Sequence, residues 1–174
     1  ADFLLLIARN EDKTGVFIVE TDRNGITRRD LQGLLGNRAS HIAEIEFENV
    51  MVPKENVLGS LDYGMNKTVS VALDIGRYNT AWAGVALAQA CLEEMVSYTR
   101  TRSQFGKKIR TYQLIQKMIG DAVTNIHAAR ALALKAGEFR KENNPNSANE
   151  TTMAKYFSSR MAMHVAEDAI QIHG

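Results

Sequence analysis

The chain has 174 residues, of which 45% are hydrophobic and 24% charged, a composition that can bury one sizeable core or two small ones. Its 21 Lys and Arg residues nearly balance 20 Asp and Glu residues, which argues against a protein that binds nucleic acid. The longest strongly apolar run, residues 3–8, is far shorter than the roughly 20 residues that span a membrane, and the single Cys91 excludes an internal disulfide and fits a reducing compartment.

The first sixty residues have the pattern of β-strands. We expect strands at 3–9, at 16–20 after a turn at 13–15, around 26–32, and at 41–52, where acidic and apolar residues alternate after Ile42. Pro53 ends the last strand because proline cannot donate a hydrogen bond to the ladder. A sheet of only about four strands would leave unpaired backbone groups at its edges. We therefore expect residues 1–59 to be the C-terminal part of a larger β-barrel or sandwich domain.

From Leu61 onward the apolar residues recur at the period of an α-helix. Helices are expected from Leu61 to about Tyr98, from about Tyr112 to Lys141, and after the polar loop KENNPNSANE, with Ser147 or Asn149 as the cap of the third. The middle of the first helix is thin enough for a neighbouring helix to approach closely, since it contains Ala81, Ala83, Gly84, Ala86, Ala88 and Ala90.

The spacing of the apolar residues also predicts which side of each helix is buried. The expected inner faces are Val69, Ala72, Leu73, Thr80, Ala83, Leu87, Ala90, Met95 and Tyr98 in the first helix, Ile115, Met118, Ile119, Ala122, Ile126 and Ala129 in the second, and Met153, Phe157, Met161, Val165, Ala169 and Ile172 in the third. Three such helices make most of a four-helix bundle. The predicted fold class is therefore mainly α with an N-terminal β part, and residues 60–174 form a truncated helical bundle.

The segment TRTRSQFGKKIR, residues 99–110, carries five cations and no acid. It could be a solvated turn near a helix C-terminus, where the helix macrodipole favours cations. A platform for single-stranded nucleic acid is disfavoured, because only two aromatic residues are available to stack on bases. The third interpretation is a pyrophosphate clamp, in which a guanidinium binds two phosphate oxygens and nearby amides reach hydroxyl groups. Arg102, Gln104 and Gln113 are the residue types that such a clamp requires.

Four passages, in order, resemble motifs of the acyl-CoA dehydrogenases. YTRTRSQFGKKIRTYQLIQ resembles the family's Y-x-x-x-R-x-Q-F-G…Q signature, and LLGNRASHIAEIEFENVMVPKENVLG resembles its G-x-R-x-S…F-x-x-V-x-V-P-x-x-N-x-L-G passage. LDIGR resembles its L-D-x-x-R helix motif, and AEDAIQIHG resembles the helix end that carries A-x-Q-x-H/L-G-G. The family fold is an N-terminal helical domain, a middle β-domain and a C-terminal four-helix bundle. The resemblance implies that this chain is the second half of the middle domain and most of the bundle.

The resemblance also implies FAD as cofactor. The family counterpart of Arg102 binds the FAD pyrophosphate of a neighbouring subunit, and residues 171–174 match the first four positions of a Q-x-x-G-G segment that adds further contacts. Lys107, Lys108 and Arg110 match no fixed contact, and we expect them on a solvated face. The implied cofactor-binding residues are Arg102, Gln104, Phe105, Gln113, Gln171 and Gly174.

Asp74 and Arg77 lie three residues apart on the first helix, so their spacing alone indicates a local ion pair. The resemblance implies instead that they bind the acyl thioester and its pantetheine arm. Family chemistry is α,β-dehydrogenation, in which a Glu removes the α-proton and a hydride passes to flavin N5. In most of the family that Glu lies beyond the bundle's G-G turn, and in another branch it precedes the motif Arg, where this chain has Gly76. We therefore assign no catalytic residue within this chain.

Further expectations concern partners and alternatives. The resemblance implies a CoA or carrier-protein thioester as substrate, an electron-transfer flavoprotein or similar acceptor, and a homotetramer, a dimer of dimers that shares FAD between subunits. It also implies a cytoplasmic location, or the mitochondrial matrix in a eukaryote. A flavin oxidase or monooxygenase on the same scaffold, or a non-catalytic flavin-binding member, is the alternative. No metal site is expected, because the four histidines lack metal-ligand spacing: His41, His127, His164 and His173.

Overall fold

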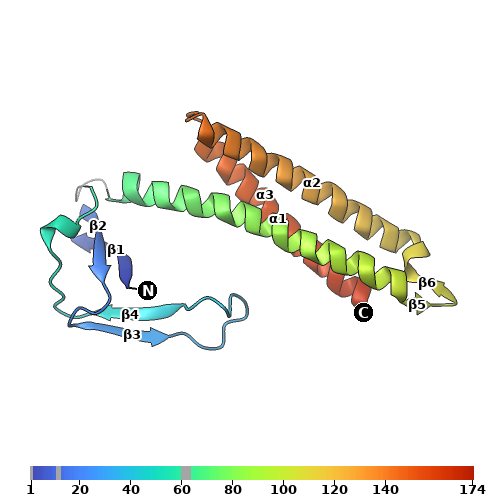
Figure 1. Ribbon diagram of the computed structural model, residues 1–174, viewed down its shortest axis with the longest axis horizontal. Coiled ribbons are helices and arrows are strands. Elements are labelled where there is room, and N and C mark those ends of the chain that lie inside the picture. Colours follow the sequence, from blue (N-terminus) through green and yellow to red (C-terminus); the bar gives the residue numbers. More distant parts are fainter. Residues whose placement is uncertain (1, 11–12, 60–63) are drawn as a thin grey trace. The chain divides into compact units, whose positions relative to one another are not determined.

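The computed structural model describes residues 2–10, 13–59 and 64–174. The chain forms two compact units, residues 1–71 and 72–174 (Figure 1). The boundary predicted between residues 59 and 60, and the predicted helix start at Leu61, fall at residues 60–63, outside the described residues. The predicted fold class, strands followed by a helical domain, is confirmed.

The first unit contains two antiparallel pairs of strands. β1 (Phe3–Asn10) pairs with β2 (Lys13–Glu20), and β3 (Ile26–Asp30) pairs with β4 (Ala43–Phe47). The four predicted strands are thus present, and in β4 the two glutamates are exposed while their neighbours are half-buried, as the alternation predicted. The turn predicted at residues 13–15 is wrong, because these residues begin β2 and Gly15 lies opposite Ala8 in the ladder. Two short helical segments follow, the 3₁₀-helix η1 (Lys54–Asn56) and the π-helix η2 (Gly64–Val69).

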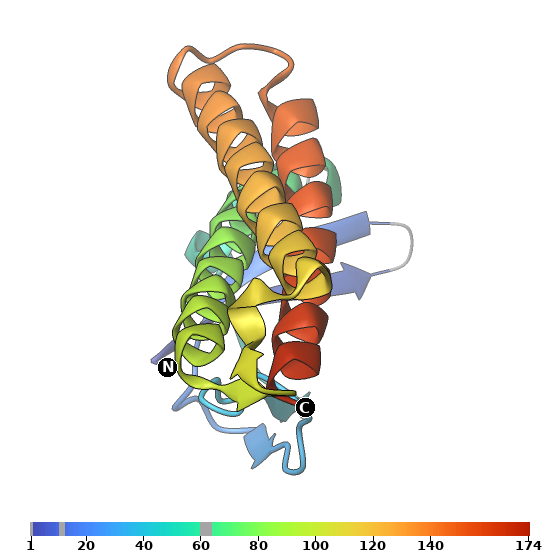
Figure 2. The ribbon, with the colours of Figure 1, turned by 90° about the vertical axis from the view of Figure 1, so that its right-hand side faces the viewer.

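The second unit is a bundle of three long helices (Figure 2). They are α1 (Ser70–Thr101), α2 (Gln113–Lys141) and α3 (Ser147–His173), and between α1 and α2 lie β5 (Ser103–Gln104), β6 (Lys107–Lys108) and η3 (Ile109–Thr111). The bounds of α2 match the prediction to within one residue. The predicted cap of α3 is wrong, since Asn146 precedes the helix without a side-chain cap, and its backbone N–H is held by Asn144 Oδ1 at 3.0 Å.

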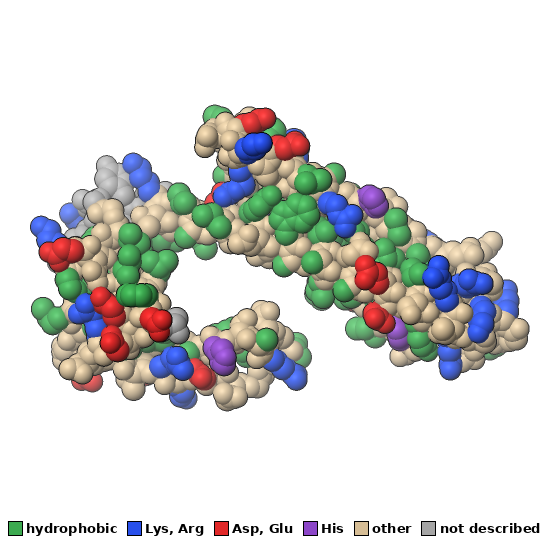
Figure 3. All heavy atoms as spheres, in the orientation of Figure 1, with side chains coloured by type: hydrophobic (Ala, Val, Ile, Leu, Met, Phe, Trp, Pro, Cys, Tyr) green, Lys and Arg blue, Asp and Glu red, His purple; other side chains and the backbone are tan. Residues whose placement is uncertain are grey.

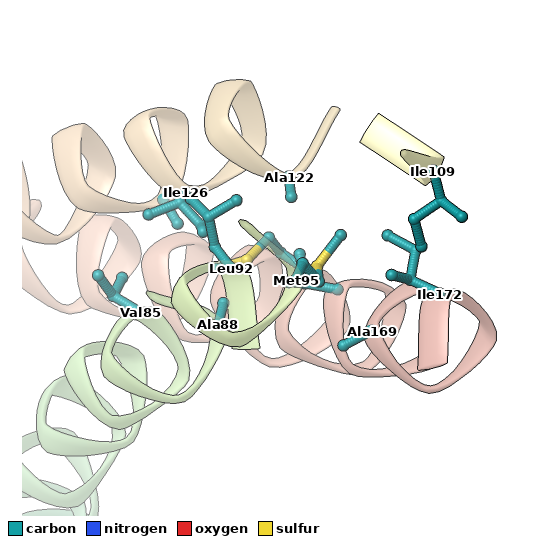
Figure 4. Close-up of a cluster of buried hydrophobic side chains, with 12 residues drawn as sticks. Val85, Ala88, Leu92, Met95, Ile109, Ala122, Ile126, Ala169 and Ile172 are labelled. Carbon is teal, nitrogen blue, oxygen red and sulfur yellow. The ribbon is translucent and has the colours of Figure 1, made fainter. Parts of the chain in front are cut away.

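The bundle core draws side chains from all three helices and from η3 (Figure 4). It contains Val85, Ala88, Leu92, Met95, Ile109, Ala122, Ile126, Ala129, Met161, Val165, Ala169 and Ile172. The predicted inner faces of α2 and α3 are confirmed except for Met153, which is 48% exposed. In α1 the prediction was largely wrong, because Leu73 and Leu87 are exposed. Apolar residues surround α1 on several sides, so periodicity alone does not identify the face that packs.

The thin middle of α1 does bring a neighbour close, as predicted. A Cβ atom added at Gly84 would lie 2.9 Å from the carbonyl oxygen of Ser158 in α3, which is closer than side-chain carbons pack. A second close approach joins α1 and α2, where a Cβ at Gly137 would lie 2.5 Å from the hydroxyl oxygen of Tyr78. Glycine at position 84 therefore permits α1 and α3 to pack at this separation, whereas Gly137 leaves room for the side chain of Tyr78.

Candidate functional site

One end of the bundle contains a pocket of about 750 Å³, a volume typical of ligand-binding sites. Its walls come from the last turn of α1, from β5 and β6, from η3 and the start of α2, and from the end of α3. Five of the six residues predicted to bind the cofactor line it: Arg102, Gln104, Phe105, Gln113 and Gly174. The sixth, Gln171, is exposed and is not part of the lining.

The shape of the pocket wall depends on a tight hairpin after α1. Ser103 pairs with Lys108 and Gln104 with Lys107, and the two linking residues both have positive φ, 52° at Phe105 and 80° at Gly106. Two left-handed residues in a row are typical of the type I′ turn, which matches the twist of antiparallel strands. Phe105 is 93% exposed at the tip of this hairpin. The turn thus projects a large aromatic ring into solvent beside the pocket.

The pocket has cationic side chains and no acidic ones among its described lining residues. Lys and Arg side chains gather at the end of the bundle that carries β5 and β6 (Figure 3). Arg102 is exposed and makes no ion pair with any described acid, so its guanidinium is available to an anion. Lys107 also lines the pocket, with its ammonium nitrogen 4.3 Å from the ring centroid of Tyr112. Lys107 is exposed, as expected for a solvated face, and its place in the pocket lining was not predicted.

Lys108 instead fits the simpler interpretation of the basic segment. Its ammonium group donates a hydrogen bond of 2.7 Å to the carbonyl oxygen of Thr101, the last residue of α1. A cation at this place neutralises the negative end of the helix dipole and satisfies a carbonyl that has no partner within the helix. The basic segment therefore has two roles, helix termination by Lys108 and a cationic pocket wall at Arg102 and Lys107.

The end of α3 is attached to the end of α1 by an aromatic contact. The rings of Tyr98 and His173 stack with centroids 4.2 Å apart and planes 28° apart, and the Tyr98 hydroxyl donates to the carbonyl oxygen of His173 at 3.4 Å. His173 Nδ1 lies 2.7 Å from the carbonyl oxygen of Ala169. Because a carbonyl only accepts, Nδ1 donates its proton in this contact. These contacts hold residues 172–174 as a wall of the pocket.

The predicted substrate residues lie elsewhere on α1. Asp74 forms an ion pair and hydrogen bond with Arg140 of α2, so the local pair with Arg77 indicated by their spacing is wrong. Arg77 is exposed and makes no ion pair with any described acid. The other oxygen of Asp74, Oδ1, is buried and has no hydrogen-bond partner among the described residues. Because this oxygen is shielded from solvent, a further donor can reach it only if neighbouring groups move.

The described residues contain neither a membrane-spanning helix nor a metal-binding cluster. No helix in the described ranges is both long and apolar enough to cross a bilayer. No group of three His, Cys, Asp or Glu side chains in those ranges is arranged to hold a metal ion. The pocket wall offers donors to an anion, aromatic and aliphatic surface, and amide groups, the set that an elongated ligand with phosphate groups requires.

Comparisons with known proteins agree with these observations. Residues 63–174 match the sequence model described as the C-terminal domain of acyl-CoA dehydrogenase. The chain is 37% identical over 181 residues to glutaryl-CoA dehydrogenase of Desulfococcus multivorans, covering 100% of this chain and 46% of that protein. It is 34% identical over 158 residues to the caffeyl-CoA reductase-Etf complex subunit CarC of Acetobacterium woodii, covering 91% and 41%.

A solved structure gives the same result for the fold. The complex of glutaryl-coenzyme A dehydrogenase with glutaryl-CoA superimposes with a TM-score of 0.94 at 36% identity, covering 100% of this chain and 45% of that one. The chain spans less than half the length of these relatives.

Proposed function

The chain belongs to the acyl-CoA dehydrogenase family, and from this premise we propose that it forms part of a flavin-dependent oxidoreductase that introduces an α,β double bond into an acyl thioester. Its relatives are named as acyl-CoA dehydrogenases and reductases, which supports flavin-dependent chemistry on CoA thioesters in general. Within that activity, this chain contributes one wall of the cofactor site and two residues of the substrate site. The thioester is carried by CoA or by a carrier protein.

The cofactor is FAD, and the pocket at the end of the bundle fits part of it. Arg102, which no described acid neutralises, binds the pyrophosphate of FAD held by a neighbouring subunit, and Lys107 adds positive charge to the same wall. Gln104, Phe105 and Gln113 lie close enough in the same lining to contact the same molecule. When bound, FAD supplies the acceptor for the hydride that leaves the β-carbon of the substrate.

The end of α3 contributes through its backbone. Gly174 has φ of 114° and lines the pocket, and a residue without a Cβ atom allows a ligand to approach the chain closely. Gln171 is also proposed to contact the cofactor; it is exposed and is not among the lining residues, and the family motif supports its role. The stack of Tyr98 on His173 keeps this segment in place.

Asp74 and Arg77 bind the acyl thioester and its pantetheine arm. The carboxylate of Asp74 is held by Arg140, and Arg77, one turn further along α1, has an exposed guanidinium that pairs with no described acid. The α-proton is removed by a Glu from outside these 174 residues. The support is that the position before Arg77, where one branch of the family has its base, is Gly76, and a Cβ atom there would meet no described atom within 4 Å.

The assembly and the electron acceptor are proposed from the family. A homotetramer, built as a dimer of dimers, would place Arg102 of one subunit against the FAD of the next. An electron-transfer flavoprotein is the proposed acceptor, since one relative is named as a subunit of a reductase-Etf complex. The proposed location is the cytoplasm, or the mitochondrial matrix in a eukaryote.

The observation that carries the proposal is that Arg102 pairs with no described acid and lines a pocket whose described lining contains no Asp or Glu. The test is the ratio of flavin to protein in purified holoprotein of Arg102→Gln, compared with Arg100→Gln, which changes an exposed cation outside the lining. Loss of a charge-assisted contact to pyrophosphate should weaken flavin retention by about tenfold or more. Equal flavin content in the two variants, or wild-type protein that purifies without flavin, would overturn the assignment of Arg102 to the flavin pyrophosphate.

A further inference from the structure

The carboxylate of the L-D-x-x-R motif has a partner that the motif does not contain. Arg140 Nη1 donates to Asp74 Oδ2, although the two residues are 66 positions apart in the sequence. Their side chains are 26% and 20% exposed, so the pair is largely shielded from water. A shielded pair orients its groups more firmly than a surface ion pair, which solvent and side-chain entropy weaken. The end of α2 therefore fixes a carboxylate near the start of α1.

Arg140 is itself held on a second side. Its guanidinium carbon lies 5.3 Å from the ring centroid of Tyr78, one helical turn after Asp74, a distance at which a cation is attracted to the aromatic face. The Tyr78 hydroxyl occupies the space where a Cβ atom at position 137 would be, one turn before Arg140 on α2. Glycine at 137 thus allows the tyrosine to close over α2 beside the arginine.

The two oxygens of Asp74 have different surroundings. Oδ2 accepts the guanidinium proton, whereas Oδ1 is buried and has no partner among the described residues. A buried acceptor without a partner raises the free energy of the protein. The neighbouring Arg77 is left outside this pair, exposed on the same helix. Had Asp74 paired with Arg77 instead, the guanidinium of Arg77 would be occupied.

We propose that Arg140 is a positioning residue for acyl-thioester binding: it holds the Asp74 carboxylate near the start of α1, and so leaves the guanidinium of Arg77 available for the ligand's negative charge. This inference rests on the proposed function and adds a residue to it. Arg140 touches neither the acyl group nor the cofactor, and its effect reaches the ligand through Asp74.

The test compares Arg140→Gln with Arg160→Gln in the flavin-loaded holoprotein. Arg160 is a matched control, because its guanidinium lies 5.5 Å from the ring of Tyr156 in the same kind of contact but has no carboxylate partner among the described residues. The probes are butyryl-CoA, octanoyl-CoA, palmitoyl-CoA and glutaryl-CoA with a dye as electron acceptor. Arg140→Gln should raise KM about tenfold with a much smaller change in kcat, and Arg140→Lys should restore part of the affinity because it keeps the charge.

A double-mutant cycle separates positioning from general loosening of the fold. In a protein that already carries Asp74→Asn, adding Arg140→Gln should raise KM no further, because Arg140 acts through that carboxylate. Far-UV circular dichroism and flavin content should match those of Arg160→Gln. A KM equal to that of the control, or an equal further increase in the Asp74→Asn background, would refute the role of Arg140. A wild-type holoprotein that oxidises neither the four probes nor the same acyl groups on a carrier protein would refute the proposed function itself, and this inference with it.

Discussion

Replacing Gly84 by Ala tests whether the close contact of α1 with α3 determines the packing of the bundle. The added methyl would lie 2.9 Å from the carbonyl oxygen of Ser158, 3.1 Å from its carbonyl carbon and 3.2 Å from its Cβ. Two of these atoms belong to the backbone of α3, so no side-chain rotation relieves the overlap. The helices must move apart, and that separation reduces the contacts of the surrounding core.

Two opposing contributions set the size of the effect. Ala in place of Gly inside a helix stabilises it by about 1 kcal/mol, through lower backbone entropy in the unfolded chain. Overpacking against a rigid neighbour costs about 1–3 kcal/mol, and a backbone neighbour favours the upper part of that range. We therefore expect Gly84→Ala to lower the free energy of unfolding by roughly 1 kcal/mol.

The assay is urea denaturation of the holoprotein followed by far-UV circular dichroism, with Gly120→Ala as the control. Gly120 lies within α2, and a Cβ atom there would meet no described atom within 4 Å. The control should therefore gain about 1 kcal/mol, which places the two variants about 2 kcal/mol apart. A Gly84→Ala protein at least as stable as Gly120→Ala would refute the argument that the two helices meet at this glycine.

Two further predictions concern single contacts. Tyr98→Leu removes the ring that stacks on His173 and should lower the free energy of unfolding by about 1 kcal/mol, whereas equal denaturation midpoints for mutant and wild type would contradict this. Arg23 donates a hydrogen bond of 2.5 Å to Glu20 and thereby lowers the pKa of Glu20 in the folded protein. At a pH above the pKa of Glu20 in the unfolded chain, the ionised carboxylate therefore stabilises the folded first unit. This stabilisation is lost as the pH falls through the lower pKa of the folded state. Arg23→Gln should raise the pKa of Glu20 in a carboxyl-carbon NMR titration, and an unchanged pKa would show that the guanidinium is not the cause.

The sequence predicted helices well where one face alone is apolar. In α2 and α3 the periodic residues Ile126, Met161 and Val165 are buried as expected. In α1 the same reasoning selected Leu87, which is exposed, because apolar side chains occur on several sides of that helix and packing against α2 and α3 decides which side is buried. The misplaced turn at residues 13–15 has a similar cause, since pairing with β1 outweighs the local preference of Gly15.

The candidate site was predictable as far as it is local in the sequence. Arg102, Gln104 and Gln113 lie within a dozen residues, and the hairpin brings them to one pocket. Their contact with a cofactor stays a prediction. The pair of Asp74 with Arg140 joins residues from separate helices, and no local spacing could indicate it. Lys107 was missed because its place in the lining depends on the Phe105–Gly106 turn, whose backbone angles the motif does not reveal.

The stack of Tyr98 on His173 links two processes that are usually considered separately. Helix ends fray, and the last turn of α3 is where fraying would begin. In this molecule the same turn forms part of the pocket wall. Any occupant that contacts residues 172–174 therefore shifts the helix–coil equilibrium of that turn toward the helix, and loosening of the turn weakens binding of the occupant by the same free energy.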